Sequence, residues 1–104
     1  MSKGVDRLFH ALGDPTRRAI VDQLTAGPLS VSGLSEPLGI TLTAVSQHLR
    51  VLEECGVVAT EKRGRVRVAS LVPDGLVPLE AWARQRRSTL ERQLDRLSKL
   101  LDEH

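Results

Sequence analysis

The sequence is poor in cysteine and in aromatic residues. Its 104 residues include one cysteine, Cys55, and two aromatic side chains, Phe9 and Trp82. A lone cysteine excludes an intrachain disulfide, which is consistent with a reducing compartment. No apolar run approaches the roughly 20 residues that a membrane-spanning helix needs, and residues 1–10 lack the continuous apolar stretch of a secretory signal. We therefore expect one ordinary cytoplasmic domain with a single hydrophobic core.

The net charge is also small, at +2, but the charges are distributed unevenly along the chain. Residues 1–40 carry four basic and four acidic side chains, whereas residues 61–68 carry four cations and one anion. Residues 84–99 carry six cations and two anions. Clustered positive charge is typical of a surface that binds an anionic partner, although a basic helix face can also simply be solvated. We expect the cluster at residues 61–68 to be functional and the later one to be mostly a solvated face.

Capping residues predict two helices at the start of the chain. Apolar side chains recur at helical spacing from Val5 to Leu12, which predicts a short first helix. Asp14 followed by Pro15 is a typical helix start, and the Gly-Pro pair at residues 27–28 ends that second helix.

Two further short helices are predicted on either side of a tight turn at residues 39–40. Ser30 can cap the first of them, which Pro37 should shorten or kink. Thr41 can cap the second, and Gly56 supplies its C-terminal stop. Two helices joined in this way are typical of a helix-turn-helix, although any helical hairpin in a bundle could look similar. The polar face of the later helix then carries Thr43, Ser46, Gln47 and Arg50.

A basic β-hairpin is predicted directly after this candidate recognition helix. Residues 57–60 and 66–71 are rich in β-branched side chains, and residues 63–65 form the turn between them. Gly64 is free to adopt the positive φ that such a turn needs. A cationic hairpin in this position is typical of the wing of a winged helix.

From about Asp74 the chain is predicted to form one long helix, regular from Pro78 to Asp102 and about 37 Å in length. Its apolar stripe is interrupted at Arg86 and is longer than so small a domain can cover, which indicates a partner helix. The alternative is that the stripe packs entirely on its own domain. The stripe consists of Leu79, Ala83, Leu90, Leu94, Leu97 and Leu101.

Two motifs, at residues 12–20 and 44–58, resemble the ArsR-type bacterial winged helix-turn-helix repressors. The resemblance extends from Phe9 to about Leu101. It implies a mainly helical fold in the order α-α-α-α-β-β-α, with residues 1–104 as a single DNA-binding domain and residues 74–104 as a dimerisation helix. It further implies a homodimer, joined through the first and last helices, that represses transcription from a palindromic operator near its own promoter. We expect Leu8 of the first helix and the apolar stripe of the last one to form the dimer interface.

The resemblance also bears on metal binding. Metal-sensing members of this family carry two cysteines one residue apart in the third helix, where this sequence has Ser30 and Ser32, and hydroxyls are poor ligands for such metals. A second family site uses pairs of Asp and His residues along the last helix, where the only histidine that this sequence offers is His104, at the very end. We therefore expect no metal and no other cofactor, and an unidentified small-molecule or redox inducer.

Cys55 is the remaining candidate sensor. It is predicted at the C-terminal end of the recognition helix, where the helix dipole does not stabilise a thiolate. We therefore expect a small buried side chain, with a redox-responsive repressor acting through Cys55 as the alternative.

The DNA contacts are expected to come from the recognition helix and the wing. Short hydroxyls and an amide can donate to and accept from base edges in the major groove, and the resemblance implies the same three positions, Thr43, Ser46 and Gln47. Arg17 and Arg18 could contact phosphates or could form intramolecular ion pairs with Asp14 or Asp22. Contacts to the backbone or the minor groove are expected from Thr41, Arg50, Lys62, Arg63 and Arg65.

The sequence also bears on two other classes of function. A winged helix can also serve as a protein-interaction module, in which case the wing cations would face an acidic partner. An enzyme is not expected, because the sequence contains no nucleophile with a nearby base, no phosphate-binding loop and no paired acids at a useful spacing.

Overall fold

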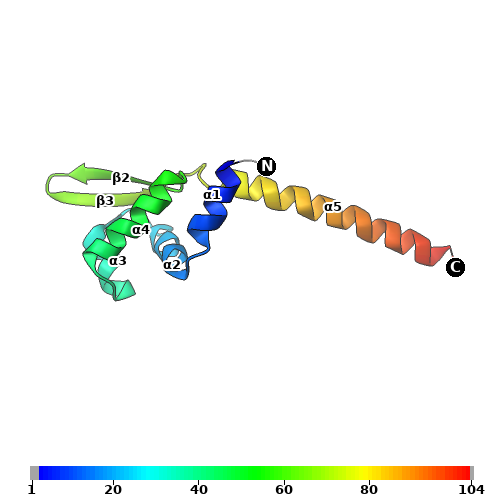
Figure 1. Ribbon diagram of the computed structural model, residues 1–104, viewed down its shortest axis with the longest axis horizontal. Coiled ribbons are helices and arrows are strands. Elements are labelled where there is room, and N and C mark those ends of the chain that lie inside the picture. Colours follow the sequence, from blue (N-terminus) through cyan, green and yellow to red (C-terminus); the bar gives the residue numbers. More distant parts are fainter. Residues whose placement is uncertain (1–2, 104) are drawn as a thin grey trace.

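The computed structural model describes residues 3–103. Residues 3–71 form a winged part, from which one long helix projects (Figure 1). The described chain measures 70 × 25 × 21 Å and its radius of gyration is 18.8 Å, against about 13 Å for a compact chain of this length. The predicted order of helices and hairpin is confirmed, with one short strand that was not predicted. The elements are α1 (Lys3–Leu12), α2 (Pro15–Leu24), β1 (Leu29–Ser30), α3 (Val31–Leu38), α4 (Leu42–Glu54), β2 (Val58–Arg63), β3 (Val66–Leu71) and α5 (Val77–Asp102).

The three predicted helix caps are confirmed. Asp14 Oδ1 accepts hydrogen bonds from the backbone N–H of Thr16 and Arg17, at 2.8 and 3.1 Å. Ser30 Oγ and Thr41 Oγ1 each accept one from the third residue of α3 and α4, both at 3.0 Å. These bonds satisfy amide groups that the first turn of a helix leaves without a partner. They therefore fix where α2, α3 and α4 begin.

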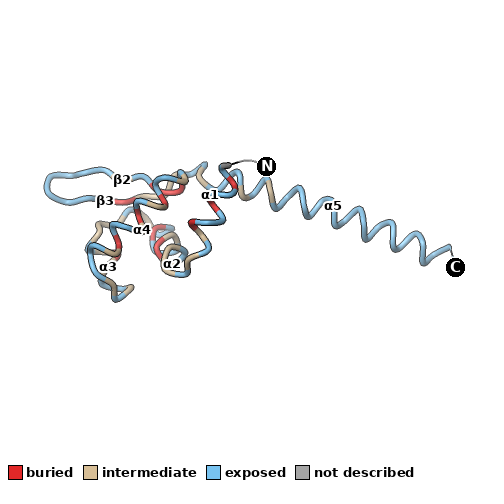
Figure 2. The backbone as a smooth tube through the Cα atoms, in the orientation of Figure 1, coloured by how far each residue is buried: buried red, intermediate tan, exposed pale blue. Residues whose placement is uncertain are grey.

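The hydrophobic core lies where α1, α2, α3 and α4 meet the base of the sheet (Figure 2). Leu34 of α3 and Leu52 of α4 are fully buried in it. Leu8, which was predicted to lie on the dimer surface, is only 1% exposed and belongs to this core, so that it is not available to a partner. Its neighbour Phe9 is 43% exposed and is the large apolar side chain that α1 presents on its surface.

The hairpin forms a three-stranded antiparallel sheet with β1, in the order β1-β3-β2. Arg63 pairs with Val66, so that the turn consists of Gly64 and Arg65 alone and is one residue shorter than predicted. Gly64 has φ of 63°, which suits the first central position of a two-residue hairpin turn. The strand β2 extends to Arg63, beyond its predicted end at residue 60.

The last helix begins at Val77 after a turn at residues 73–76, and it has no buried residue. Only its start packs on the rest of the chain, where Leu79 contacts the core and α5 lies against α1. Four of the predicted stripe residues, Leu90, Leu94, Leu97 and Leu101, are between 52 and 67% exposed, and Leu100 is exposed as well. His104 lies outside the described residues. No helix within residues 3–103 is long and apolar enough to cross a membrane.

The chain enters α5 through a close crossing over the end of α4. A Cβ atom added to Gly75 would lie 2.6 Å from the backbone oxygen of Gly56 and 2.8 Å from Cα of Val57. The N–H of Val72 also donates to the carbonyl of Val57 at 2.8 Å. Glycine is therefore needed at residue 75 because two backbone segments touch there.

Candidate DNA-binding interface

The exposed face of α4 carries the polar side chains that the sequence predicted. Val45, Leu49 and Leu52 point into the core, which turns Thr43, Ser46, Gln47 and Arg50 to the opposite, exposed side. Within residues 3–103 none of these four side chains takes part in a hydrogen bond or an ion pair. The face therefore offers free donors and acceptors to a ligand. Thr41 is also exposed, but its hydroxyl oxygen already caps α4.

The hairpin register divides the wing cations between two faces. Thr60 is opposite Ala69 and Lys62 is opposite Arg67, so that these side chains share one face of the sheet. Ala69 is fully buried, which shows that this face continues from the core toward α4. Arg63 lies on the other face, where its Nε is 2.5 Å from Oε1 of Glu61. The structure thus separates Lys62 from Arg63, which the sequence could only group together.

A hollow of about 310 Å³ lies between the exposed face of α4 and the wing. Arg67, which was not among the predicted site residues, lines it from the wing. Its Nη1 donates to Oγ1 of Thr60 at 2.7 Å, and the Thr60 hydroxyl donates to Oε1 of Glu53 at 3.1 Å. The side chains that line the hollow are Ser46, Leu49, Arg50, Glu53 and Arg67.

Arg17 and Arg18 turn toward the end of α1 instead of toward a ligand. Nε of Arg17 donates to the carbonyl of Ala11 and Nη1 of Arg18 donates to that of Leu12, both at 2.6 Å. These bonds satisfy carbonyl groups that the last turn of α1 leaves free. The N–H of Arg17 also holds the pKa of the Asp14 carboxyl below its ordinary value. Both arginines therefore have a structural role in joining α1 to α2.

An aromatic pair covers the start of α5. The rings of Phe9 and Trp82 meet edge to face with centroids 4.9 Å apart and an interplanar angle of 82°. The guanidinium of Arg86 lies over the Trp82 ring, with its Cζ 4.7 Å from the ring centroid. This contact accounts for the cation that interrupts the apolar stripe of α5, which the sequence pattern alone did not explain.

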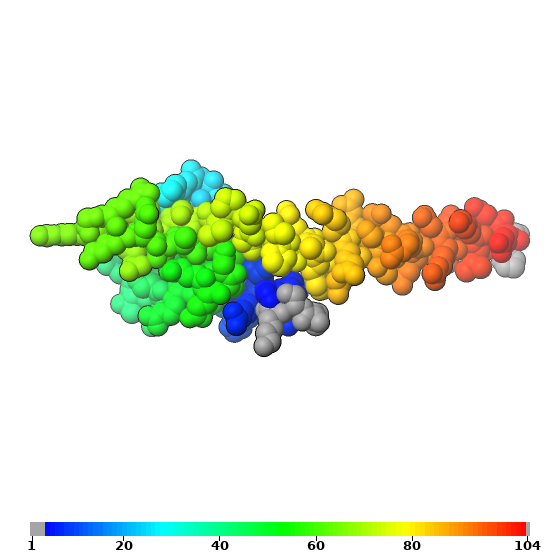
Figure 3. Space-filling view, turned by 90° about the horizontal axis from the view of Figure 1, so that it is seen from above, coloured from blue at the N-terminus to red at the C-terminus, as the bar shows by residue number. Residues whose placement is uncertain are grey.

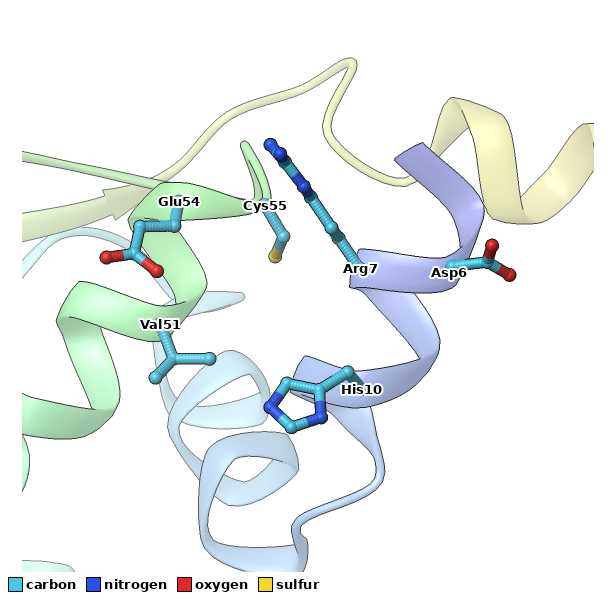
Figure 4. Close-up of a pocket in the computed structure, with 6 residues that line it drawn as sticks. All are labelled: Asp6, Arg7, His10, Val51, Glu54 and Cys55. Carbon is cyan, nitrogen blue, oxygen red and sulfur yellow. The ribbon is translucent and has the colours of Figure 1, made fainter. Parts of the chain in front are cut away.

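Cys55 lies in a groove of about 550 Å³ between α1 and the end of α4 (Figure 4). It is half-buried, and its Sγ donates to the carbonyl of Leu52 at 3.3 Å. The groove is lined from α1 by Asp6, Arg7 and His10 and from the end of α4 by Val51 and Glu54. No group of three or more His, Cys, Asp or Glu side chains within residues 3–103 is placed to hold a metal ion.

The arrangement of these elements defines a class of protein. Helices α3 and α4 form a helix-turn-helix, the wing stands beside the exposed face of α4, and α5 projects from the opposite end of the molecule (Figure 3). This is the architecture of a winged helix-turn-helix domain.

Comparisons with known proteins give the family. Residues 14–60 match the family model described as bacterial regulatory protein, arsR family. The HTH-type transcriptional regulator Rv2034 of Mycobacterium tuberculosis is 47% identical over 74 residues, which are 71% of this chain and 69% of that protein. The chain belongs to the ArsR family of winged helix-turn-helix transcriptional regulators.

Solved structures of this family have the same fold. The crystal structure of an ArsR family transcriptional regulator has a TM-score of 0.79 at 35% identity and covers 86% of this chain and 92% of that one. The solution structure of a homodimeric winged helix-turn-helix DNA-binding domain from Mycobacterium bovis has a TM-score of 0.67 at 25% identity, and the match covers 82% of this chain and 79% of that domain. The predicted fold class is therefore confirmed.

Proposed function

We propose that this chain is a homodimeric, metal-independent repressor that binds an inverted-repeat operator, with residues 1–104 as one functional unit and residues 74–104 as its dimerisation segment. The observation that carries the proposal is the exposed face of α4, whose polar side chains have no partner within residues 3–103 and which lies beside a cationic wing. Unpaired hydroxyls and amides next to clustered cations suit a ligand that combines base edges with phosphates.

Each part of this surface has its own role in the proposal. Thr43, Ser46 and Gln47 read base edges in the major groove, and Gln47 is the best suited to do so, because its amide both donates and accepts. The backbone or the minor groove is contacted by Arg50, Lys62, Arg63 and Arg65, with Thr41 positioned at the start of the helix.

Dimerisation through α5 supplies the symmetry that an inverted repeat requires. The exposed leucines of this helix need a partner, and a second α5 has the matching stripe. Parallel pairing would set Arg84, Arg86 and Arg87 against their own copies, whereas antiparallel pairing sets them near the acidic end at Asp102 and Glu103. We therefore infer an antiparallel pair with one winged part at each end.

The proposal of metal independence rests on the side chains of α3. Ser30 and Ser32 lie with their Oγ atoms 3.2 Å apart, and Ser30 also caps the helix. Two hydroxyls bonded to one another and to the backbone are poor ligands for soft or borderline metals. The inducing signal is then a small molecule or a redox change.

Fluorescence anisotropy on the DNA upstream of the gene and on a scrambled duplex, across a salt series, tests the proposal. We expect tight, salt-sensitive binding to the upstream duplex with two chains per duplex by mass determination. Gln47→Ala should change the order of preference among operator variants, costing about 1–3 kcal/mol at one base position, whereas Arg65→Ala should weaken binding to all duplexes alike. Equal weak binding to both duplexes would refute the proposal.

A further inference from the structure

Two cations lie directly opposite each other on the face of the wing that continues toward α4. Lys62 and Arg67 are cross-strand partners, both are exposed, and neither forms an ion pair within residues 3–103. Like charges in this arrangement destabilise a sheet. On the opposite face Arg63 is neutralised by Glu61. Of the two faces of the wing, the one that meets the recognition helix therefore carries the unneutralised charge, and an anion bound there would relieve the repulsion.

Arg67 is the better oriented of the two cations because it is held by a directed chain of hydrogen bonds. The Thr60 hydroxyl accepts from Arg67 at 2.7 Å and gives its own proton to Glu53 at 3.1 Å. A hydroxyl has one proton, so the donation to Glu53 leaves the oxygen lone pairs free for the guanidinium. The chain ties the wing to the last turns of α4 without an ion pair between Arg67 and Glu53, and the remaining guanidinium N–H groups stay available.

The hollow beside Arg67 has the position that a DNA strand requires. It lies between the face of α4 that carries Ser46 and Arg50 and the part of the wing that carries Arg67. If α4 enters the major groove and the wing reaches the neighbouring minor groove, the sugar-phosphate strand that separates the two grooves passes between them. A phosphate at this place would meet Arg50 from the helix and Arg67 from the sheet.

We propose that Arg67, together with Lys62 and Arg50, forms a phosphate clamp for the backbone strand that runs between the recognition helix and the wing. Arg67 binds the phosphate, and Thr60 and Glu53 are positioning residues that act through it. This inference rests on the proposed DNA binding and adds a residue that the sequence did not single out, together with the reason for its orientation.

The salt dependence of operator binding tests the clamp on the full-length chain. Because each operator binds two chains, Arg67→Ala removes two phosphate contacts. It should therefore lower the slope of log K against log salt concentration by about 1.8 and should weaken binding about 60-fold near 0.1 M salt. The matched control is Arg96→Ala, which removes the same charge from an exposed position of α5 and should leave the slope unchanged. All of these side chains are exposed or half-buried, so thermal unfolding should verify that each variant keeps the fold.

A double-mutant cycle separates positioning from a purely structural role. Thr60→Val should weaken operator binding several-fold in the native chain but have no effect in the Arg67→Ala background, and Thr60→Ser should restore the native affinity. Equal weakening by Thr60→Val in both backgrounds would overturn the positioning role. If the native chain binds its operator but Arg67→Ala keeps the native slope and affinity, the clamp is wrong and the proposed function stands. If the native chain shows no operator preference, the proposed function fails and the clamp fails with it.

Discussion

The winged part and α5 use the same apolar residue types with opposite results. Leu34, Leu49 and Leu52 of the winged part are at most 2% exposed, whereas Leu94 and Leu97 of α5 are more than 50% exposed. Figure 2 shows the same contrast between elements, because buried segments lie within the winged part and α5 is exposed along almost its whole length. Both regions are amphipathic helices with leucine at helical spacing. The difference is that one set of helices finds its neighbours within the chain, and the other extends beyond every neighbour the chain can provide. Helical periodicity thus indicates which face will be buried but not which chain will bury it.

The largest effect is expected from placing charge on the exposed stripe of α5. The double variant Leu94→Glu/Leu97→Glu should dissociate the dimer, because it places charged groups in the apolar seam and, in the antiparallel pair, brings the carboxylates of the two copies of residue 94 close together. Loss of the second winged part should weaken operator binding by about 10²–10⁴-fold. Sedimentation velocity and anisotropy would measure the two losses. Ser88→Glu, which lies off the stripe, should leave the dimer intact, and a dimeric double variant would contradict the role given to α5.

A smaller but still large effect is expected from truncating one leucine in each region. Leu52→Ala should lower the free energy of unfolding by about 2–5 kcal/mol, because it leaves a cavity in a fully packed core. Leu97→Ala leaves no cavity within the chain, so its cost should appear only as a weaker dimer. Urea unfolding at several protein concentrations distinguishes the two variants. Only the loss of stability in Leu97→Ala should depend on the protein concentration. A concentration-independent loss for Leu97→Ala would mean that α5 packs on its own domain.

The smallest effect concerns the cap at the start of α2. The pKa of Asp14 is lowered from an ordinary value of 3.8, chiefly by the N–H of Arg17. The carboxylate therefore contributes stability above its unfolded pKa, and that contribution is lost as the pH falls through the lower folded value. Asparagine caps a helix as well as aspartate does, but it does not titrate. The melting temperature of Asp14→Asn should thus fall slightly below the native one at pH 7, and the difference should shrink as the pH falls through the folded pKa of Asp14. If the difference between the two melting temperatures did not shrink as the pH was lowered, this account would be contradicted.

The sequence was sufficient for features that depend on local chemistry. Asp14, Ser30 and Thr41 cap helices because their side chains bond to amides two or three residues away, and no distant contact is needed to predict this. The polar face of α4 follows from helical periodicity in the same way. The confirmed order of helices and hairpin rests on such local signals.

The sequence alone could not predict features that depend on strand register or on packing between elements. A two-residue turn in place of a three-residue one decides which wing side chains share a face, so Arg67 could not be distinguished from Arg63. Leu8 and Phe9 are neighbours at the edge of the apolar face of α1, and only the packing of the other helices decides that Leu8 is the buried one. The strand β1 has two residues and exists only because β3 lies beside it.

The crossing at Gly75 connects the segment before α5 to the segment after α4. The backbone of residue 75 lies against Gly56 and Val57, and the N–H of Val72 donates to the carbonyl of Val57, so that the two segments are held together at this point. If two copies of α5 pair as proposed, a change in that pairing would be transmitted through this contact as a rotation of each winged part. An inducer that acts on the helix pair would alter the spacing of the two recognition helices without touching either of them.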